Sequence, residues 1–315
     1  RGTTSTSPAR SSTAATSPAR CSPAARVNLS HARFTSGNIT FSHAQFTGGN
    51  VNLSHARFTS GNITFSHARF TGGNVNLSHA RFTSGYVDFG SARFTDGEVS
   101  FHLARFTGGS VDFSSAQFTG GHVDFRDTHF TNGQTTLDSA RFTGGNVNFS
   151  HAQFTGGRVN LRHAQFLGGR ISFHKMHFAE GYVTFSRTWF TGSHVDISSV
   201  WVTGSHVDFS NTRHTGGNVN FSHAQFTGGH VDFSNTRHTG GRADFTRTRF
   251  AAIQVDFIGA RFAGGDVDLS TTFSSTPPAF DLWTDGPPEG LLLPSDFRAD
   301  TGDADLDSGG SLEFE

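Results

Sequence analysis

Histidine recurs at one fixed position of a repeated pattern, which makes it the first candidate for chemistry. A twelve-residue unit starts as VNLSHARFTSGN at Val27 and keeps its phase over 20 units to Asp266. Stacked imidazoles could bind Zn²⁺ or Ni²⁺, or titrate together at about pH 6 as a pH-responsive surface. Because the ring is copied with its unit, we expect solvent-facing rings without ligand geometry, and we predict no metal and no cofactor. The position 5 histidines are His31, His43, His55, His67, His79, His151, His163 and His223.

Charged residues occupy two further positions of the unit. Arginine is frequent at position 7, as in Arg33, Arg57 and Arg81, whereas position 2 changes from Asn or Thr to Asp in the later units. Basic and acidic columns on separate faces predict a striped surface, and a solvated face is its simplest interpretation. The late acidic column is the candidate interaction surface, and its residues are Asp196, Asp208, Asp232, Asp244, Asp256 and Asp268.

Two histidines stand where the pattern demands an apolar residue. Position 8 is Phe in 17 of the 20 units, but His214 and His238 replace it. A buried imidazole needs a hydrogen-bond partner and tends to be neutral. We therefore expect a local distortion that turns both rings outward, with an interior metal site as the alternative.

The spacing of apolar residues predicts the elements that carry these columns. Positions 1 and 3, and then 6 and 8, are apolar, as in Val27, Leu29, Ala32 and Phe34. This period of two predicts two short strands in each unit. Glycine at positions 10 and 11 allows a corner with positive φ. A unit this short cannot bury its own apolar face, so the units must stack into a solenoid.

Each half of the unit also resembles a known family. The blocks Val27–His31 and Ala32–Ser36, VNLSH and ARFTS, resemble pentapeptide repeats, as do VDF at Val123 and at Val231. The resemblance to pentapeptide-repeat proteins, in particular bacterial ones, implies an all-β, right-handed quadrilateral parallel β-helix. Two extra residues follow every second pentapeptide, so four faces would take two twelve-residue units per coil. A flatter helix with a single unit per coil is the alternative.

Composition narrows the class of protein. The net charge is −1 and the pI is near 7.1, which favours neither a basic nucleic-acid-binding protein nor a strongly acidic one. The single Cys21 excludes an internal disulfide framework. No apolar run is long enough for a transmembrane helix. We expect a cytoplasmic location and no direct contact with nucleic acid. The chain does not start with Met, which is compatible with a missing upstream segment.

Four segments follow from the pattern. Residues 1–26 are rich in Ser, Pro, Ala and Arg and are expected to be disordered, residues 27–273 form the solenoid, and residues 295–315 are an acidic tail expected to be disordered. Residues 274–294 carry Phe280, Trp283 and several prolines, and are expected to cap the open end of the helix. The N-terminal end is expected to be covered by residues 1–26 or by a second copy in a head-to-head dimer.

No nucleophilic triad, phosphate-binding loop or pair of carboxylates in a cleft is recognisable, so we do not expect an enzyme. The sequence predicts a non-catalytic scaffold that binds a protein. The resemblance implies an alternative, because some pentapeptide-repeat proteins imitate DNA and bind type II topoisomerases; the late Asp column would serve that role.

Overall fold

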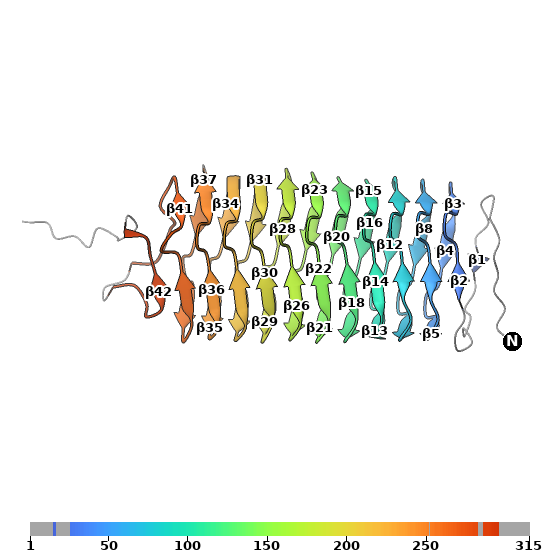
Figure 1. Cartoon of the computed structure of the whole chain (residues 1–315), viewed down its shortest axis with the longest axis horizontal. Coiled ribbons are helices and arrows are strands. Elements are labelled where there is room, and N and C mark those ends of the chain that lie inside the picture. The colour runs from blue at the N-terminus through green and yellow to red at the C-terminus, as the bar shows by residue number, and fades with distance from the viewer. Residues whose placement is uncertain (1–14, 17–25, 252, 283–285, 296–315) are drawn as a thin grey trace, which may run out of the picture.

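The protein is an elongated stack of β-strands. The computed structural model describes residues 15–16, 26–251, 253–282 and 286–295, and every element of regular structure in this part of the chain is a strand. Successive coils follow one another along the long axis from the N-terminal to the C-terminal end (Figure 1). Among the described residues, no helix has the length and apolarity needed to span a membrane.

The register of the strands fixes the length of a coil. Val51 pairs with Val75, and Phe82 pairs with Phe106, in both cases in parallel and with an offset of two units. The same offset, about 24 residues, recurs through about 11 turns. The predicted parallel β-helix with two units per coil is therefore confirmed, and the alternative coil of a single unit is wrong. Since two consecutive units make one coil, equivalent positions of neighbouring units lie on different faces.

Each coil contributes strands to four faces. The first half of the odd-numbered units, counted from Val27, forms a 12-stranded sheet. Its strands are β2 (Val27–Asn28), β6 (Val51–Asn52), β10 (Val75–Asn76), β14 (Glu98–Ser100), β18 (His122–Asp124), β22 (Asn146–Asn148), β26 (Arg170–Ser172), β30 (His194–Asp196), β33 (Asn218–Asn220), β36 (Arg242–Asp244), β40 (Asp266–Asp268) and β42 (Leu291–Leu292). The second half of the even-numbered units forms a 10-stranded sheet. Its strands are β5 (Gln45–Thr47), β9 (Arg69–Thr71), β13 (Arg93–Asp96), β17 (Gln117–Thr119), β21 (Arg141–Thr143), β25 (Gln165–Leu167), β29 (Trp189–Thr191), β32 (Arg213–Thr215), β35 (Arg237–Thr239) and β39 (Arg261–Ala263).

The two remaining faces are joined into one 20-stranded sheet, because β31 and β34 run through the corner between them. The strands of this sheet are β1 (Ala15–Thr16), β3 (Arg33–Phe34), β4 (Asn38–Thr40), β7 (Arg57–Phe58), β8 (Asn62–Thr64), β11 (Arg81–Phe82), β12 (Tyr86–Asp88), β15 (Arg105–Thr107), β16 (Ser110–Asp112), β19 (His129–Thr131), β20 (Gln134–Thr136), β23 (Gln153–Thr155), β24 (Arg158–Asn160), β27 (His177–Ala179), β28 (Tyr182–Thr184), β31 (Trp201–Asp208), β34 (Gln225–Asp232), β37 (Arg249–Ala251), β38 (Gln254–Asp256) and β41 (Phe273–Ser274).

Columns of phenylalanine fill the interior. Phe94, Phe118 and Phe142 are almost completely buried and stack in parallel, with ring centroids 4.7 and 4.6 Å apart. This separation is the spacing of hydrogen-bonded strands, so each ring packs on the ring one coil away. Ala116 and its equivalents are also buried and leave room for the rings. The core is therefore one continuous apolar column along the whole solenoid.

A tight turn inside each unit places position 5 in an unusual conformation. The N–H of Ala56 donates to the carbonyl of Leu53, and His55 in the turn has a φ of 57°. Position 5 has a positive φ in every one of the 20 units, even where it is the bulky Leu103 or Arg187. From the sequence, positive φ was expected at the glycine corners alone. Histidine tolerates this region better than most residues, which gives the histidine column a backbone role.

Both ends of the solenoid are covered in part. At the N-terminal end β1 pairs with β4, with Ala15 opposite Ile39. At the C-terminal end β42 pairs with β40, and the Phe280 ring stacks on Phe257 with centroids 5.0 Å apart. Of the two segments expected to be disordered, only residues 15, 16, 26 and 295 lie within the described part of the chain.

Candidate functional site

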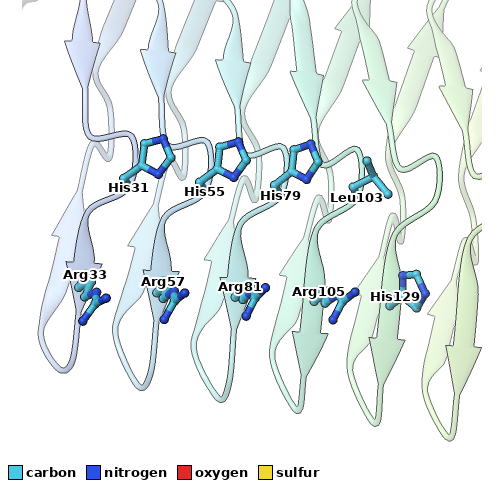
Figure 2. Close-up of a pocket in the computed structure, with 9 residues that line it drawn as sticks. All are labelled: His31, Arg33, His55, Arg57, His79, Arg81, Leu103, Arg105 and His129. Atoms are coloured by element: carbon cyan, nitrogen blue, oxygen red, sulfur yellow. The ribbon is translucent and has the colours of Figure 1, made fainter.

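A basic groove runs along the solenoid near its N-terminal end. It lies between position 5 and position 7 of the odd-numbered units, and its volume is about 350 Å³. Figure 2 shows the imidazoles of His31, His55 and His79 in one row and the guanidinium groups in a parallel row that ends at His129. We call it the N-terminal groove, and its lining residues are His31, Arg33, His55, Arg57, His79, Arg81, Leu103, Arg105 and His129.

The electrostatics of the N-terminal groove are one-sided. Its lining includes four arginines and no carboxylate. Asn28, Asn52 and Asn76, which occupy the second position of the same units, are neutral. Desolvation, followed by the charges of His79 and His31, lowers the pKa of the His55 ring. The groove therefore presents a row of fixed positive charges beside imidazoles that repel one another when protonated.

The exposed histidine rings are arranged as a stack. His31 and His55 are parallel with centroids 4.7 Å apart, and His55 and His79 are 4.6 Å apart. Ring faces are occupied by neighbouring rings, and the lone pairs of parallel rings point in the same direction instead of converging on one ion. Among the described residues, no three metal-ligating side chains converge on a common point.

The positive φ at position 5 gives a prediction for stability. Leu103 has a φ of 58° and is exposed, and a left-handed conformation costs most residues roughly 1–2 kcal/mol. We expect Leu103→Asn to stabilise the protein by about 0.5–1 kcal/mol, because Asn tolerates this conformation. Urea denaturation measures the change, and Leu103→Val should have the opposite sign because β-branched side chains are the least tolerant there.

The candidate acidic column is divided between two faces of the coil. Asp208, Asp232 and Asp256 are register partners and form one ladder in the 20-stranded sheet. On the 12-stranded sheet Asp244 pairs with Asp268, whereas Asn220 separates Asp196 from Asp244. The structure thus unites three of the six candidates on one face and places the other three on another.

These aspartates also have a local role. The carboxylate of Asp208 accepts the N–H of Ser210 at 2.8 Å, and that of Asp232 accepts the N–H of Ser234 at 2.7 Å. Asn52 accepts the N–H of Ser54 in the same way. Position 2 therefore caps the turn that follows it, which explains why Asn and Asp alternate there.

The two inward histidines are buried, so the expectation of outward rings is wrong. His214 is 7% exposed and His238 is 2% exposed. His214 stacks on Phe190 with centroids 4.8 Å apart, as a phenylalanine would. Regular strand pairing on both sides holds the rings inside, with His214 opposite His238. The strand pairing thus keeps both imidazoles buried although an imidazole is better solvated in water.

A second groove lies near the C-terminal end, between the same two positions of the even-numbered units. The exposed Trp189 is part of its lining, and the Arg213 guanidinium lies 5.2 Å from the centre of the Trp189 ring. Unlike the N-terminal groove, it includes a carboxylate, Asp281. The individual columns were recognisable in the sequence, but both grooves were missed. Reading every second unit instead of every unit would have revealed the unbroken run Arg33, Arg57, Arg81 and Arg105.

Comparisons with known proteins found matches among solved structures. No protein-family model matches the chain, and no curated protein matches its sequence. Among solved structures, the chain is similar to HetL, a pentapeptide repeat protein involved in heterocyst differentiation regulation from the cyanobacterium Nostoc sp. strain PCC 7120. The identity is 14%, over 78% of this chain and 88% of HetL, with a TM-score of 0.21.

The chain is also similar to QnrB1, a plasmid-mediated fluoroquinolone resistance protein, with 14% identity over 79% of this chain and 92% of that one and a TM-score of 0.27. These neighbours are pentapeptide-repeat β-helices. The fold of this chain is established by its own strand register.

Proposed function

We propose that this protein is a non-catalytic scaffold that binds a protein partner through the N-terminal groove. The observation that carries the proposal is the row of four guanidinium groups in register with no carboxylate in the groove lining. A core of stacked phenylalanines holds the strands, so the backbone fixes the spacing of the row along the solenoid.

Charge complementarity defines the partner as an acidic segment. Neighbouring rungs are about 4.8 Å apart, so the row of arginines spans about 14 Å, the length of an extended segment of four to five residues. Carboxylates accept two hydrogen bonds from one guanidinium. Single-stranded nucleic acid fits less well, because it relies on free aromatic faces for base stacking, and the imidazole faces here stack on each other.

Charge reversal in the groove tests this proposal. We expect Arg57→Glu/Arg81→Glu to weaken binding of a fluorescent Glu-rich peptide about tenfold, because two charge pairs of roughly 0.5–1 kcal/mol each are lost. Fluorescence anisotropy at low and high salt measures the affinity, which should fall as salt rises.

The matched control is Arg69→Glu/Arg93→Glu. These arginines occupy position 7 on the 10-stranded sheet and are also exposed register partners. The net charge changes equally in both variants, but the control changes a face whose neighbouring position 2 column includes Asp88. Equal weakening in the two variants would mean a non-specific effect of net charge and would contradict the proposal.

The ladder of Asp208, Asp232 and Asp256 supports a second candidate function, a DNA mimic that binds a type II topoisomerase. Three carboxylates repeat at the coil spacing on one face, as a row of negative charges must for DNA mimicry. The remaining candidates Asp196, Asp244 and Asp268 would have to act from another face.

A gyrase supercoiling assay distinguishes the two aspartate faces. If the second candidate holds, the full chain inhibits supercoiling, and Asp208→Asn/Asp232→Asn/Asp256→Asn abolishes inhibition while keeping the turn-capping oxygen. The control Asp196→Asn/Asp244→Asn/Asp268→Asn removes the same charge from the 12-stranded sheet and should still inhibit. Absence of inhibition by the unmodified chain would discard this candidate.

A further inference from the structure

Two neighbouring imidazoles interrupt one of the phenylalanine columns inside the solenoid. His214 and His238 are consecutive rungs of the 10-stranded sheet, and their ring centroids are 5.9 Å apart with planes tilted by 42°. Phenylalanine pairs of the same column, such as Phe94 and Phe118, are 4.7 Å apart and tilted by 2°. The two imidazoles have thus separated and turned relative to each other.

Each ring has a nitrogen without a partner. His214 Nδ1 and His238 Nε2 are buried and form no hydrogen bond. Burial, reinforced by His238, lowers the pKa of His214 to about 3. Burial also lowers the pKa of His238, opposed by a hydrogen bond to the Gly241 backbone. Both rings are therefore neutral near pH 7, and each unpartnered nitrogen can hold a lone pair.

A small cavity lies beside the two rings. Its volume is about 30 Å³, and its lining includes His214, His238, Phe221, Phe245 and Ala243. Ala243 stands where its register partners on either side, Val219 and Val267, are larger. The two methyl groups that Ala243 lacks relative to Val leave additional space in the cavity. No carboxylate contributes to the lining.

We propose that His214 and His238 form a buried binding site for a single soft monovalent metal ion of the Cu(I) type. Imidazole nitrogen is a good ligand for copper, and metal–imidazole bonds of about 2 Å place two ligating nitrogens about 4 Å apart. The ring centroids are 5.9 Å apart, so the two imidazoles must turn toward each other when the ion binds. A zinc ion would need about four ligands, whereas the cavity lining offers the two imidazoles and the Thr236 hydroxyl, which already donates to the Phe209 carbonyl.

The cost of burying charge also favours a monovalent metal ion over a divalent one. The cost of burying an ion rises with the square of its charge, and a divalent ion would find no carboxylate to offset it. Phe262, which is partly exposed, also lines the cavity.

Silver retention tests the proposal, with Ag⁺ as a probe that does not change oxidation state. The full chain carries Cys21→Ser, because a free thiol binds the same ion. After incubation with excess Ag⁺, free imidazole strips exposed sites on a desalting column, and silver per chain is measured by mass spectrometry. We expect one silver ion per chain and a higher thermal midpoint than without silver.

Two variants make the result specific. His214→Phe/His238→Phe restores the repeat residue and should retain at least tenfold less silver with no shift in midpoint. His55→Asn/His79→Asn removes two exposed rings and should still retain one ion. Equal retention in the first variant would overturn the proposal, as would no retention in the Cys21→Ser chain.

Discussion

Gly217→Ala is expected to destabilise the protein by about 2–5 kcal/mol, as the sum of backbone strain and overpacking. Gly217 has a φ of 80°, and an added methyl group would overlap the Ser193 carbonyl oxygen and lie 2.9 Å from its carbonyl carbon. Both contacts are with backbone one coil away, so a side-chain rotation cannot relieve them. Urea denaturation followed by circular dichroism measures the loss of free energy of unfolding.

The neighbouring residue provides the control. Gly216 also has a positive φ, 64°, but an added methyl group would meet nothing within 4 Å. Gly216→Ala should therefore cost only the conformational strain of roughly 1–2 kcal/mol. If the two substitutions had equal effects, the close contact between Gly217 and the Ser193 backbone one coil away would not contribute to the loss of stability. That result would contradict the prediction.

His214→Phe/His238→Phe is expected to remove most of the acid sensitivity of the metal-free protein. In the folded state the pKa of His214 is lowered to about 3 by burial, whereas in the unfolded chain it is about 6.5. The unfolded state therefore takes up a proton first, and stability falls as pH decreases from about 6.5 toward about 3. The loss is about 1.4 kcal/mol per pH unit for such a group, or roughly 2.7 kcal/mol at pH 4.5.

The variant should be more stable than the unmodified chain at pH 4.5 and show a smaller gain at pH 7.5, where only improved packing contributes. Free energies of unfolding at the two pH values measure the difference. His43→Asn/His67→Asn, which changes two exposed rings, should leave the pH dependence nearly unchanged. If the free energy of unfolding of the His214→Phe/His238→Phe variant changed with pH as steeply as that of the unmodified chain, the burial of these rings in neutral form would be contradicted.

The core was predictable from sequence because it depends on periodicity alone. Alternation of Val and Phe with period two, repeated in every unit, leaves few ways to bury the side chains. The alternation of neighbouring units favoured two units per coil, and the strand register confirms it. Neither inference needs side-chain contacts between particular residues.

The candidate sites were less predictable, because they depend on which residues share a face. The same position in consecutive units lies on two different faces of the coil. Asp208 and Asp244 therefore appear equivalent in sequence but lie on different sheets. The burial of His214 could not be foreseen from its polarity, since its strand is held in register by neighbours on both sides. The positive φ of His55 leaves no mark in a simple hydrophobic pattern.

Every surface described above depends on a coil of two units, and the distance between two spin labels tests that length directly. Thr35 and Thr131 are exposed, lie eight units apart at the same position of the repeat, and can be replaced by Cys in a Cys21→Ser chain. Four such coils place their backbones about 19 Å apart. A double electron–electron resonance distance near that value, allowing for the label arms, is predicted. A distance of about 38 Å, corresponding to eight coils of a single unit each, would contradict the fold and the sites built on it.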